Sequence, residues 1–327
     1  MPRLSEVVRY RGDRLFDGAV DLSWLVGDRE KARDVATAYV FHGPAYHGVR
    51  QQDVGLGSEH KLVDSATFTH QIVRRCAGRE EKAFTLAIAG YGTGKSHLAT
   101  ALAILLSEPE SPAAKEVLEN LKAADPDLGK AVETDISMMS APALVLALNG
   151  MRNFDLATEL GQQATKFLRS KNIDTRALDE LRPRFRIARS LVERLHEEER
   201  KQLCAECGTS TCEEVLKKLE EFDEGLFAIV QVYLSGLGLE IRAIGDETVG
   251  DVIRTICQEY VGEGHPFSRL VVLFDEFGRY AEFATVRSQI AGSGVLQQLF
   301  EGIQAESEGA KAVFVGFIQF ELDAYVQ

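Results

Sequence analysis

FTLAIAGYGTGKSHLAT, at residues 84–100, joins a short apolar run to a glycine-rich turn and then to the start of a helix with apolar periodicity. The three glycines of the turn let the backbone curl so that several N–H groups point to one side, which makes a nest for an oligophosphate. Lys95 adds a mobile positive charge, and the hydroxyl of Ser96 suits a phosphate-bound Mg²⁺. The helix that begins here directs its positive end at the same anion. The stretch therefore predicts a phosphate-binding loop.

This pattern is that of a Walker A motif, with Ala89 in the place of its usual first glycine. The alternative is a chance GKS in a glycine-rich turn. We favour the motif because a strand before it and a helix after it are the context that it requires. The predicted nucleotide contacts are Gly90, Tyr91, Gly92, Thr93, Gly94, Lys95, Ser96 and His97.

A second motif, LVVLFDEFGRY, occupies residues 270–280 and has the form of a Walker B motif. Its apolar run predicts a buried parallel strand, so Asp275 and Glu276 should lie at the strand's C-terminal edge, where α/β folds bind ligands. Asp275 is predicted to hold Mg²⁺ through its water shell. Glu276 is predicted to act as the general base on the attacking water. A strand that simply ends in a charged turn is the weaker interpretation after a Walker A motif.

A later apolar run, residues 312–318, predicts another buried strand and is followed by Gln319. A polar side chain at this point can touch the γ-phosphate or the attacking water, so Gln319 is a candidate sensor. A solvated strand end is an equally good interpretation. The predicted catalytic set is thus Glu276, Lys95 and Gln319, with Ser96 and Asp275 as the predicted metal ligands.

Composition limits the class of protein. The chain has 327 residues, of which 45% are hydrophobic, which is ample for a packed core. Its net charge of −13 argues against a broad positive surface for nucleic acid or an anionic membrane. It does not argue against a local basic groove. The charged N-terminus and the lack of a long apolar run argue against a signal peptide or membrane span. Few, unevenly spaced cysteines fit a reducing compartment, so we expect a cytoplasmic protein.

The order of apolar patterns predicts an α/β fold with a parallel central sheet and helices on both faces. Helices are predicted near residues 29–39, 65–75, 95–106, 113–124, 248–260 and 294–303, and a second buried strand at 143–148. The stretch 226–234 reads as a buried apolar run. The predicted divisions are an N-terminal region at 1–64, a first part of the core at 65–153, a helical insertion at 154–245 and a second part of the core at 246–327.

CAECGTSTC, at residues 204–212, lies inside the predicted insertion. Its cysteines, with His196 upstream, have spacings that can share a Zn²⁺, but a fourth ligand is not obvious. We favour a turn between two helices, with Gly208 as the C-cap and Thr211 or Ser210 as the next N-cap. The zinc interpretation stays open for Cys204, Cys207 and Cys212.

The sequence of motifs resembles that of the additional-strand P-loop ATPases of AAA+ or STAND type. The sequences GYGTGKSHLA and FDEFGRY together resemble the corresponding motifs of the large bacterial phage-defence ATPases of the BREX and phage growth limitation type. The resemblance covers about residues 68–106 and 270–319, and the segment 154–245 departs from it. It implies Mg²⁺-dependent ATP hydrolysis that remodels a protein or nucleic-acid partner, with adenine preferred over guanine. It also implies a protein partner or homo-oligomer, with any nucleic-acid contact made through a larger complex.

In that family a fifth strand and a helical lid follow, and arginine fingers come from a neighbouring subunit. Because the chain ends at Gln327, we expect a fragment of a longer protein with weak turnover on its own. Arg279 and Arg287 are the nearest candidate cations, and ordinary surface arginines are an equal alternative. The main rival function is a nucleotide-gated switch or scaffold that binds ATP with little turnover. A small-molecule kinase is less favoured, because Asp and Glu together end the Walker B strand.

Overall fold

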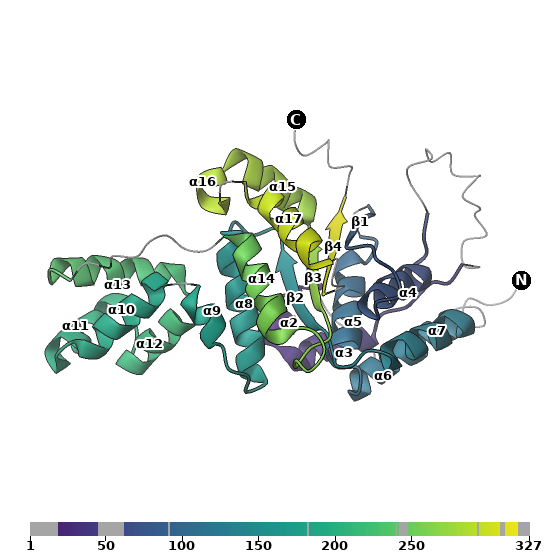
Figure 1. Ribbon diagram of the computed structural model, residues 1–327, viewed down its shortest axis with the longest axis horizontal. Helices are drawn as coiled ribbons and strands as arrows, with labels where there is room; N and C mark the ends of the chain where they lie inside the picture. The colour runs from purple at the N-terminus through teal and green to yellow at the C-terminus, as the bar shows by residue number, and fades with distance from the viewer. Residues whose placement is uncertain are drawn as a thin grey trace, which may run out of the picture.

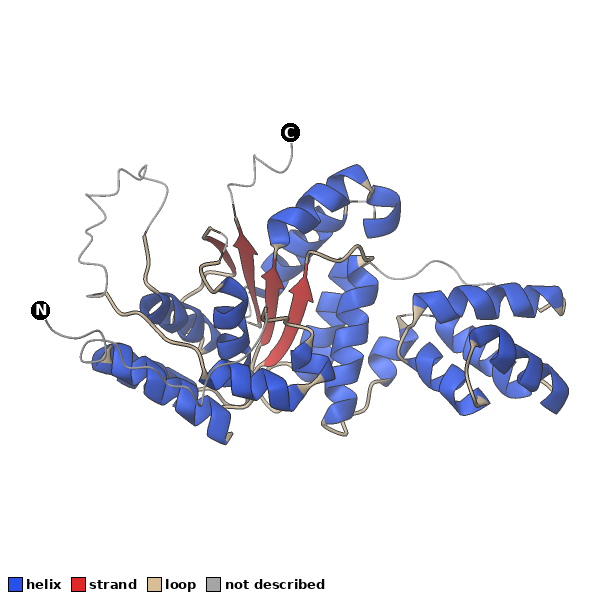
Figure 2. Cartoon of the chain, turned by 180° about the vertical axis from the view of Figure 1, so that it is seen from behind, coloured by secondary structure: helices blue, strands red, loops and turns tan. Residues whose placement is uncertain are grey.

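A computed structural model describes residues 19–44, 62–90, 92–181, 183–239, 241, 248–292, 294–307 and 311–319. Its centre is a parallel sheet with the order β1-β4-β3-β2. Figure 2 shows these strands in red between two layers of helices. The strands are β1 (Phe84–Ile88), β2 (Leu144–Asn149), β3 (Leu270–Asp275) and β4 (Ala312–Ile318). The predicted α/β class and parallel sheet are confirmed, and the predicted strands agree to within one residue at each end.

The register brings the ends of the strands to one edge of the sheet. Asn149 pairs with Asp275, and Ile88 pairs with Ile318, which directly precedes Gln319. Only β4 separates β1 from β3. Gly316 of β4 leaves room for the side chain of Leu86, its partner in β1, because a Cβ at Gly316 would lie 2.9 Å from that side chain. The segments that follow β1, β2, β3 and β4 therefore meet at a single edge.

One face of the sheet is covered by helices from the first part of the chain. These are α2 (Trp24–Gly27), α3 (Arg29–Thr37), α4 (Ser65–Cys76), α5 (Lys95–Ser107), α6 (Pro112–Ala124) and α7 (Pro126–Ser137). Of these helices, α4 to α7 lie on the right in Figure 1, and α2 lies low and near the middle. Arg29 and Arg33 both pair with Glu108, the C-cap of α5, at 2.7 and 2.8 Å. The described part of the predicted N-terminal region is thus built into the core layer.

The opposite face is covered by helices from the middle and end of the chain. These are α8 (Leu156–Ser170), α14 (Val249–Tyr260), α15 (Phe277–Val286), α16 (Ser288–Ala291) and α17 (Val295–Ser307), with the short α9 (Arg176–Glu180) beside them. Leu156, Leu160 and Leu178 share one apolar cluster with Leu146 and Phe274 of the sheet. Although the prediction began the helical insertion at residue 154, α8 and α9 pack with the sheet.

Gln163 of α8 covers the outer edge of β2. Its side chain accepts a hydrogen bond from the backbone N–H of Ala147 at 2.9 Å and donates one to the carbonyl of the same residue at 2.8 Å. These are the two backbone groups of Ala147 that face away from β3, and they would otherwise need water or another strand. The amide therefore satisfies the edge where a further strand would pair.

Residues 183–239 form a helical lobe with an apolar core of its own, drawn at the left of Figure 1. It contains α10 (Pro183–Arg194), α11 (Glu197–Cys207), α12 (Cys212–Glu220) and α13 (Glu224–Gly236). The stretch predicted as a buried run is part of α13, and Val232 within it is 72% exposed. That prediction was wrong in part, because α13 is an outer helix of a small lobe and buries one side only.

Candidate functional site

The glycine loop leads from β1 into α5. Ala89 continues the strand pairing by donating its N–H to the carbonyl of Ile318 at 3.1 Å. Gly92 and Gly94 have φ angles of 75° and 82°, in the left-handed region that glycine adopts without strain, and Gly94 is the N-cap of α5. No atom lies within 4 Å of a Cβ built at Gly90 or Gly92. The concave side of the loop is thus open to a ligand at a helix N-terminus, where anions are favoured.

Lys95 lies under this loop and is only 9% exposed. Its Nζ donates hydrogen bonds to the carbonyls of Ala89 at 2.8 Å and Gly90 at 2.9 Å. The hydroxyl of Thr93 donates to the same Gly90 carbonyl at 2.8 Å. Among the described residues, the acceptors of the ammonium group are thus neutral carbonyls, which an anion could replace with stronger, charge-assisted bonds.

Ser96 and Asp275 meet across the sheet edge. The Ser96 hydroxyl donates to Oδ2 of Asp275 at 2.5 Å, although 179 positions separate them in the sequence. Asp275 is 3% exposed, and this burial is the main reason that its pKa is raised above the ordinary aspartate value. The Ser96 hydrogen bond lowers that pKa, and the charge of Glu276 raises it further. The structure thus brings both predicted metal ligands to one point.

Glu276 and Gln319 form a second polar contact at this edge. Nε2 of Gln319 donates to both carboxylate oxygens of Glu276, at 2.8 and 2.9 Å. Glu276 has a φ of 52°, which is uncommon for a residue other than glycine, and its N–H donates to Oδ1 of Asp275 at 3.0 Å. Backbone strain of this kind clusters at functional sites. The predicted base and the predicted sensor are therefore neighbours.

The residues that directly follow β2 complete the site, and they were missed in the sequence. Gly150 donates its N–H to the carbonyl of Asp275 at 2.8 Å, and a Cβ at Gly150 would lie 2.2 Å from the carbonyl oxygen of Glu276. Asn149, in register with Asp275, accepts a hydrogen bond from the N–H of Met151 at 3.0 Å. The available signal was the polar Asn149, followed by Gly150, at the end of a buried strand. A polar residue at the end of a buried strand is also what pointed to Asp275.

Other predicted contacts lie elsewhere or outside the described residues. The ring of His97 is turned towards α3, where Nε2 lies 2.6 Å from the Val35 carbonyl and the ring packs edge-on against Tyr39. Its side chain therefore faces the helical layer. Tyr91 lies outside the described residues.

The cysteine segment has the form of the favoured turn. Gly208 is the C-cap of α11 with a φ of 63°, and Thr211 is the N-cap of α12, where its hydroxyl accepts from Glu214 N–H. The three cysteines are free thiols, and burial is the main reason that the pKa of Cys207 is raised to about 11. Within the described residues no group of three or more His, Cys, Asp or Glu side chains could hold a metal ion.

The donor set at Ser96 and Asp275 suits a hard cation. Both ligands are oxygens, and Mg²⁺ is usually held by one or two protein oxygens together with phosphate and water. The open glycine loop and the Lys95 ammonium supply the matching place for the phosphates. These residues fit a magnesium–nucleotide complex, although two protein ligands are too few for a metal site that stands alone.

Comparison of the chain with protein-family models, curated proteins and solved structures found no match. Among the helices in the described ranges, none combines the length and the apolar character that crossing a bilayer requires. The residues at the sheet edge, through their chemistry and geometry, are therefore the guide to function.

Proposed function

We propose that the chain binds ATP with Mg²⁺ at the glycine loop and hydrolyses its terminal phosphate. The observation that carries this proposal is the 2.5 Å hydrogen bond between Ser96 and Asp275, next to the Lys95 ammonium. The sheet order supports it, because β4 stands as an additional strand between the strand of the glycine loop and the strand of Asp275. A P-loop NTPase of the additional-strand type is the fold that we infer.

Each binding residue has a defined task in this proposal. The loop N–H groups and the N-terminus of α5 bind phosphate oxygens. Lys95 exchanges the carbonyls of Ala89 and Gly90 for phosphate oxygens and neutralises part of their charge. Ser96 and Asp275 would hold Mg²⁺, which when bound supplies positive charge at the phosphates. A bound cation would also reduce the energetic cost of burying the Asp275 carboxylate, which two hydrogen bonds already offset in part.

Hydrolysis is assigned to Glu276 and Gln319. Glu276 accepts a proton from a water molecule whose oxygen attacks the terminal phosphorus. The bond from that phosphorus to the bridging oxygen breaks, and ADP and phosphate leave. Gln319, whose Nε2 contacts both Glu276 oxygens, orients the carboxylate.

The same contact favours a second candidate function, a nucleotide-gated switch or scaffold with little turnover. Gln319 donates to both oxygens of Glu276 and so fixes the direction of the carboxylate, and a base that is held pointing away from the attacking water turns over slowly although its remaining lone pairs could accept a proton. A chain in which this contact persists would bind ATP and hydrolyse it slowly. Binding, and not turnover, would then set its conformation or assembly.

The wider role rests on the resemblance of the two motifs. We propose that nucleotide turnover remodels a protein or nucleic-acid partner in bacterial phage defence, through a homo-oligomer or a complex with a protein partner. The helical lobe is the segment that differs from a minimal ATPase module, and it offers this role a separate surface.

The test compares the wild-type chain with Lys95→Ala, Glu276→Gln and a control, Lys115→Ala. Lys115 is an exposed lysine whose only described partner is the exposed Glu110. Binding of a fluorescent ATP analogue with and without Mg²⁺ is measured beside phosphate release, with GTP as competitor. We expect Lys95→Ala to weaken binding by at least about tenfold, or roughly 1.4 kcal/mol. Glu276→Gln should keep binding and lose roughly 10²–10⁴-fold in turnover.

The outcomes separate the candidates. A wild-type chain that does not bind ATP, or a Lys95→Ala variant that binds as well as wild type, contradicts the proposed site. Binding with no turnover in either wild type or Glu276→Gln supports the switch. Transfer of labelled phosphate to an acceptor other than water would instead indicate a kinase.

A further inference from the structure

A pocket of about 470 Å³ lies beside Glu276, between the loop that follows β2 and the outer side of α15 and α16. Its volume falls within the roughly 300–1,000 Å³ of ligand pockets. We call it the α15 groove. Figure 1 shows α15 and α16 at the top of the view, on the side where the strands end. The groove is lined by Gly150, Met151, Asn153, Arg279, Glu282, Phe283, Val286, Arg287 and Ile290.

Large apolar side chains are exposed around this groove. Val286 is 72%, Met151 64% and Ile290 51% exposed, and these three line one pocket from three separate segments. Single exposed apolar residues need no explanation, but a group of them around a concavity marks an interaction surface. The groove thus offers a place for an apolar side chain of a partner.

The charges of the groove are cationic in an acidic protein. Arg279 and Arg287 line it with a single carboxylate, Glu282, whereas the whole chain carries a net charge of −13. Neither arginine forms an ion pair with a carboxylate among the described residues. Uncompensated cations beside an apolar pocket complement a segment that carries negative charge and an apolar side chain.

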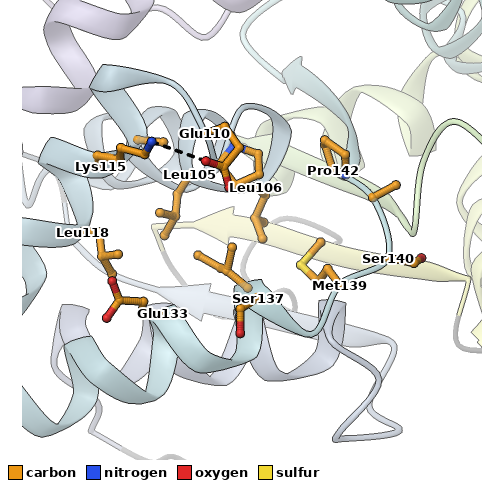
Figure 3. Close-up of a pocket in the computed structure, with 14 residues that line it drawn as sticks. Leu105, Leu106, Glu110, Lys115, Leu118, Glu133, Ser137, Met139, Ser140 and Pro142 are labelled. Carbon is orange, nitrogen blue, oxygen red and sulfur yellow. Dashed lines mark ion pairs between the residues drawn. The ribbon is translucent and has the colours of Figure 1, made fainter.

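A pocket of about 500 Å³ at the opposite edge of the sheet provides a contrast (Figure 3). It lies between the C-terminal end of α5, α6 and α7, and its charges are already compensated. Glu110 pairs with Lys115 at 3.3 Å, drawn as a dashed line, and Glu133 pairs with Lys122 at 3.0 Å. That pocket therefore lacks the charge selectivity of the α15 groove.

The groove is mechanically connected to Glu276. Gly150, which lines it, has no room for a Cβ against the Glu276 carbonyl oxygen, and α15 begins directly after Glu276. Phe154 ties the loop to α15, because its ring stacks on Tyr280 at 4.7 Å and its carbonyl accepts from the Tyr280 hydroxyl at 3.2 Å. An occupant that contacts both walls would therefore contact two segments that adjoin the backbone of Glu276.

We propose that the α15 groove is a docking site for an acidic polypeptide segment with an exposed apolar side chain, and that its occupation changes turnover through Gly150 and Glu276. The effect on turnover, which we call the coupling half of the proposal, rests on the proposed ATPase function. The binding of the segment, the docking half, does not. A nucleic-acid strand is disfavoured because Glu282 lines the groove and repels phosphates, and because the aromatic in its described lining, Phe283, is partly buried and packs on the core. A second copy of the chain is disfavoured because a stable dimer buries roughly 1,200–2,000 Å², far more than a single groove offers.

The docking half is tested by fluorescence anisotropy with labelled 16-residue probe peptides. One probe carries Glu and Asp around Leu and Phe anchors, a second replaces the acids with Lys and Arg, and a third replaces the anchors with Ser. A 16-nucleotide single strand of DNA is the fourth probe. The first probe should bind at least about tenfold more tightly than the other three, a difference of roughly 1.4 kcal/mol.

Two double variants decide whether this binding occurs in the groove. Val286→Asp with Arg287→Glu should weaken binding of the first probe by at least about tenfold, because it removes an apolar contact and a cation together. Val232→Asp with Arg194→Glu is the matched control on the helical lobe, because Val232 is exposed to the same 72%. The control should bind the probe as the wild type does.

Each other outcome overturns the docking site. These are stronger binding of the basic peptide or the DNA, equal loss in the control, a groove-dependent dimer in sedimentation, or no binding of the acidic probe below about 1 mM. The coupling half is tested by adding the first probe to the ATPase assay. A change of turnover at saturation in wild type but not in the groove variant supports it, and unchanged turnover contradicts it. If the chain does not bind ATP, the proposed function fails, while anisotropy still decides the docking site.

Discussion

The Ser96 hydroxyl and the Asp275 carboxylate share a 2.5 Å hydrogen bond that joins the first turn of α5 to the end of β3. This contact holds a carboxylate at 3% exposure, and the charge of Lys95 acts on it. Burial of this kind opposes folding whenever the group is charged. The burial of the Asp275 carboxylate therefore has a cost in stability that the Ser96 hydrogen bond offsets only in part, and a substitution can reveal it.

We expect Asp275→Asn to raise the free energy of unfolding of the nucleotide-free protein near neutral pH. Burial raises the pKa of Asp275, so its ionisation is less favourable in the folded chain than in the unfolded one. The wild type therefore loses stability as the pH rises through the folded-state pKa, and the variant does not. The gain should disappear below the ordinary aspartate pKa of about 3.8, where the carboxyl is neutral in both states. Urea unfolding from pH 3 to pH 8 measures the difference.

The control for this prediction is Asp34→Asn, which changes an exposed carboxylate on α3. It should leave the pH dependence of unfolding unchanged. A neutral-pH stability of Asp275→Asn at or below that of wild type would mean that Ser96 and nearby cations outweigh the burial. The same variant should lose the Mg²⁺-dependent part of its ATP affinity.

Gly150→Ala should reduce turnover and leave ATP binding nearly intact. The new Cβ would lie 2.2 Å from the Glu276 carbonyl, so the base must move, while the glycine loop and Lys95 are not touched. Misplacement of a catalytic group by about 1 Å costs on the order of 100-fold in rate. We expect kcat to fall by about 10- to 100-fold with KM within about threefold of wild type.

Gly161→Ala is the matched control, because a Cβ at Gly161 in α8 meets no atom within 4 Å. It should keep wild-type kinetics. Circular dichroism and thermal unfolding of both variants report any loss of folding. A Gly150→Ala protein that turns over normally, or that loses binding and turnover in parallel, would show that Gly150 does not position the base.

Glu108→Gln should destabilise the layer formed by α3 and α5. Glu108 is 7% exposed and accepts from both Arg29 and Arg33. Loss of a buried partner for two charged donors costs about 1–3 kcal/mol at pH 7. Chemical unfolding measures this loss in the free energy of unfolding, with Glu110→Gln as the control. Glu110 is 91% exposed and pairs only with Lys115 among the described residues, so its loss should cost at most about 1 kcal/mol.

The pH dependence of this network has the opposite sign to that of Asp275. Burial raises the pKa of Glu108, but hydrogen bonds from Arg33 and Arg29 outweigh it, so the pKa is lowered. The network therefore contributes stability above the ordinary glutamate pKa of about 4.5 and loses it as the pH falls through the folded-state value. The difference in free energy of unfolding between wild type and Glu108→Gln should therefore decrease as the pH is lowered. A difference that stays constant down to pH 2 would contradict a stabilising role for the charged Glu108 network.

Gln163→Met should destabilise the edge of the sheet, because it removes both hydrogen bonds to Ala147 at similar side-chain size. Two backbone groups would be left without their partner, and each unsatisfied buried group costs about 1–3 kcal/mol. Gln297→Met, on the exposed side of α17, is the control. Urea unfolding measures the effect. A loss no larger than the control's would show that water replaces the amide.

Local patterns were enough to predict the strands and the two motifs. Unbroken apolar runs predict parallel strands that are buried on both faces, and residues 270–275 and 312–318 are buried throughout. The glycine loop was predictable because its chemistry lies in consecutive residues. Their meeting at Asp275 was expected from the pairing of the two motifs and from the sheet edge at which a parallel strand ends, since residues far apart in the chain leave no local trace of their contact.

The features that the sequence did not predict depend on tertiary contacts. The apolar stripe of α8 has the same period whether it packs on a sheet or on another helix, so the border of the insertion could not be placed. His97 follows Ser96 directly, but one residue of helix turns the side chain by about 100°, away from the loop and towards α3. The role of Gly150 depends on a carbonyl oxygen 126 positions later, which no spacing rule connects to it.

The amide of Gln163 closes the β2 edge of the sheet to pairing with a further strand. An incoming strand, from this chain or from another molecule, cannot pair at β2 until it displaces the side chain that already occupies the hydrogen-bonding groups of Ala147. A single glutamine thereby acts as a gatekeeper against edge-to-edge aggregation at the strand that carries Asn149 and leads into Gly150. Protection of this edge from misassembly thus depends on the contact between α8 and β2.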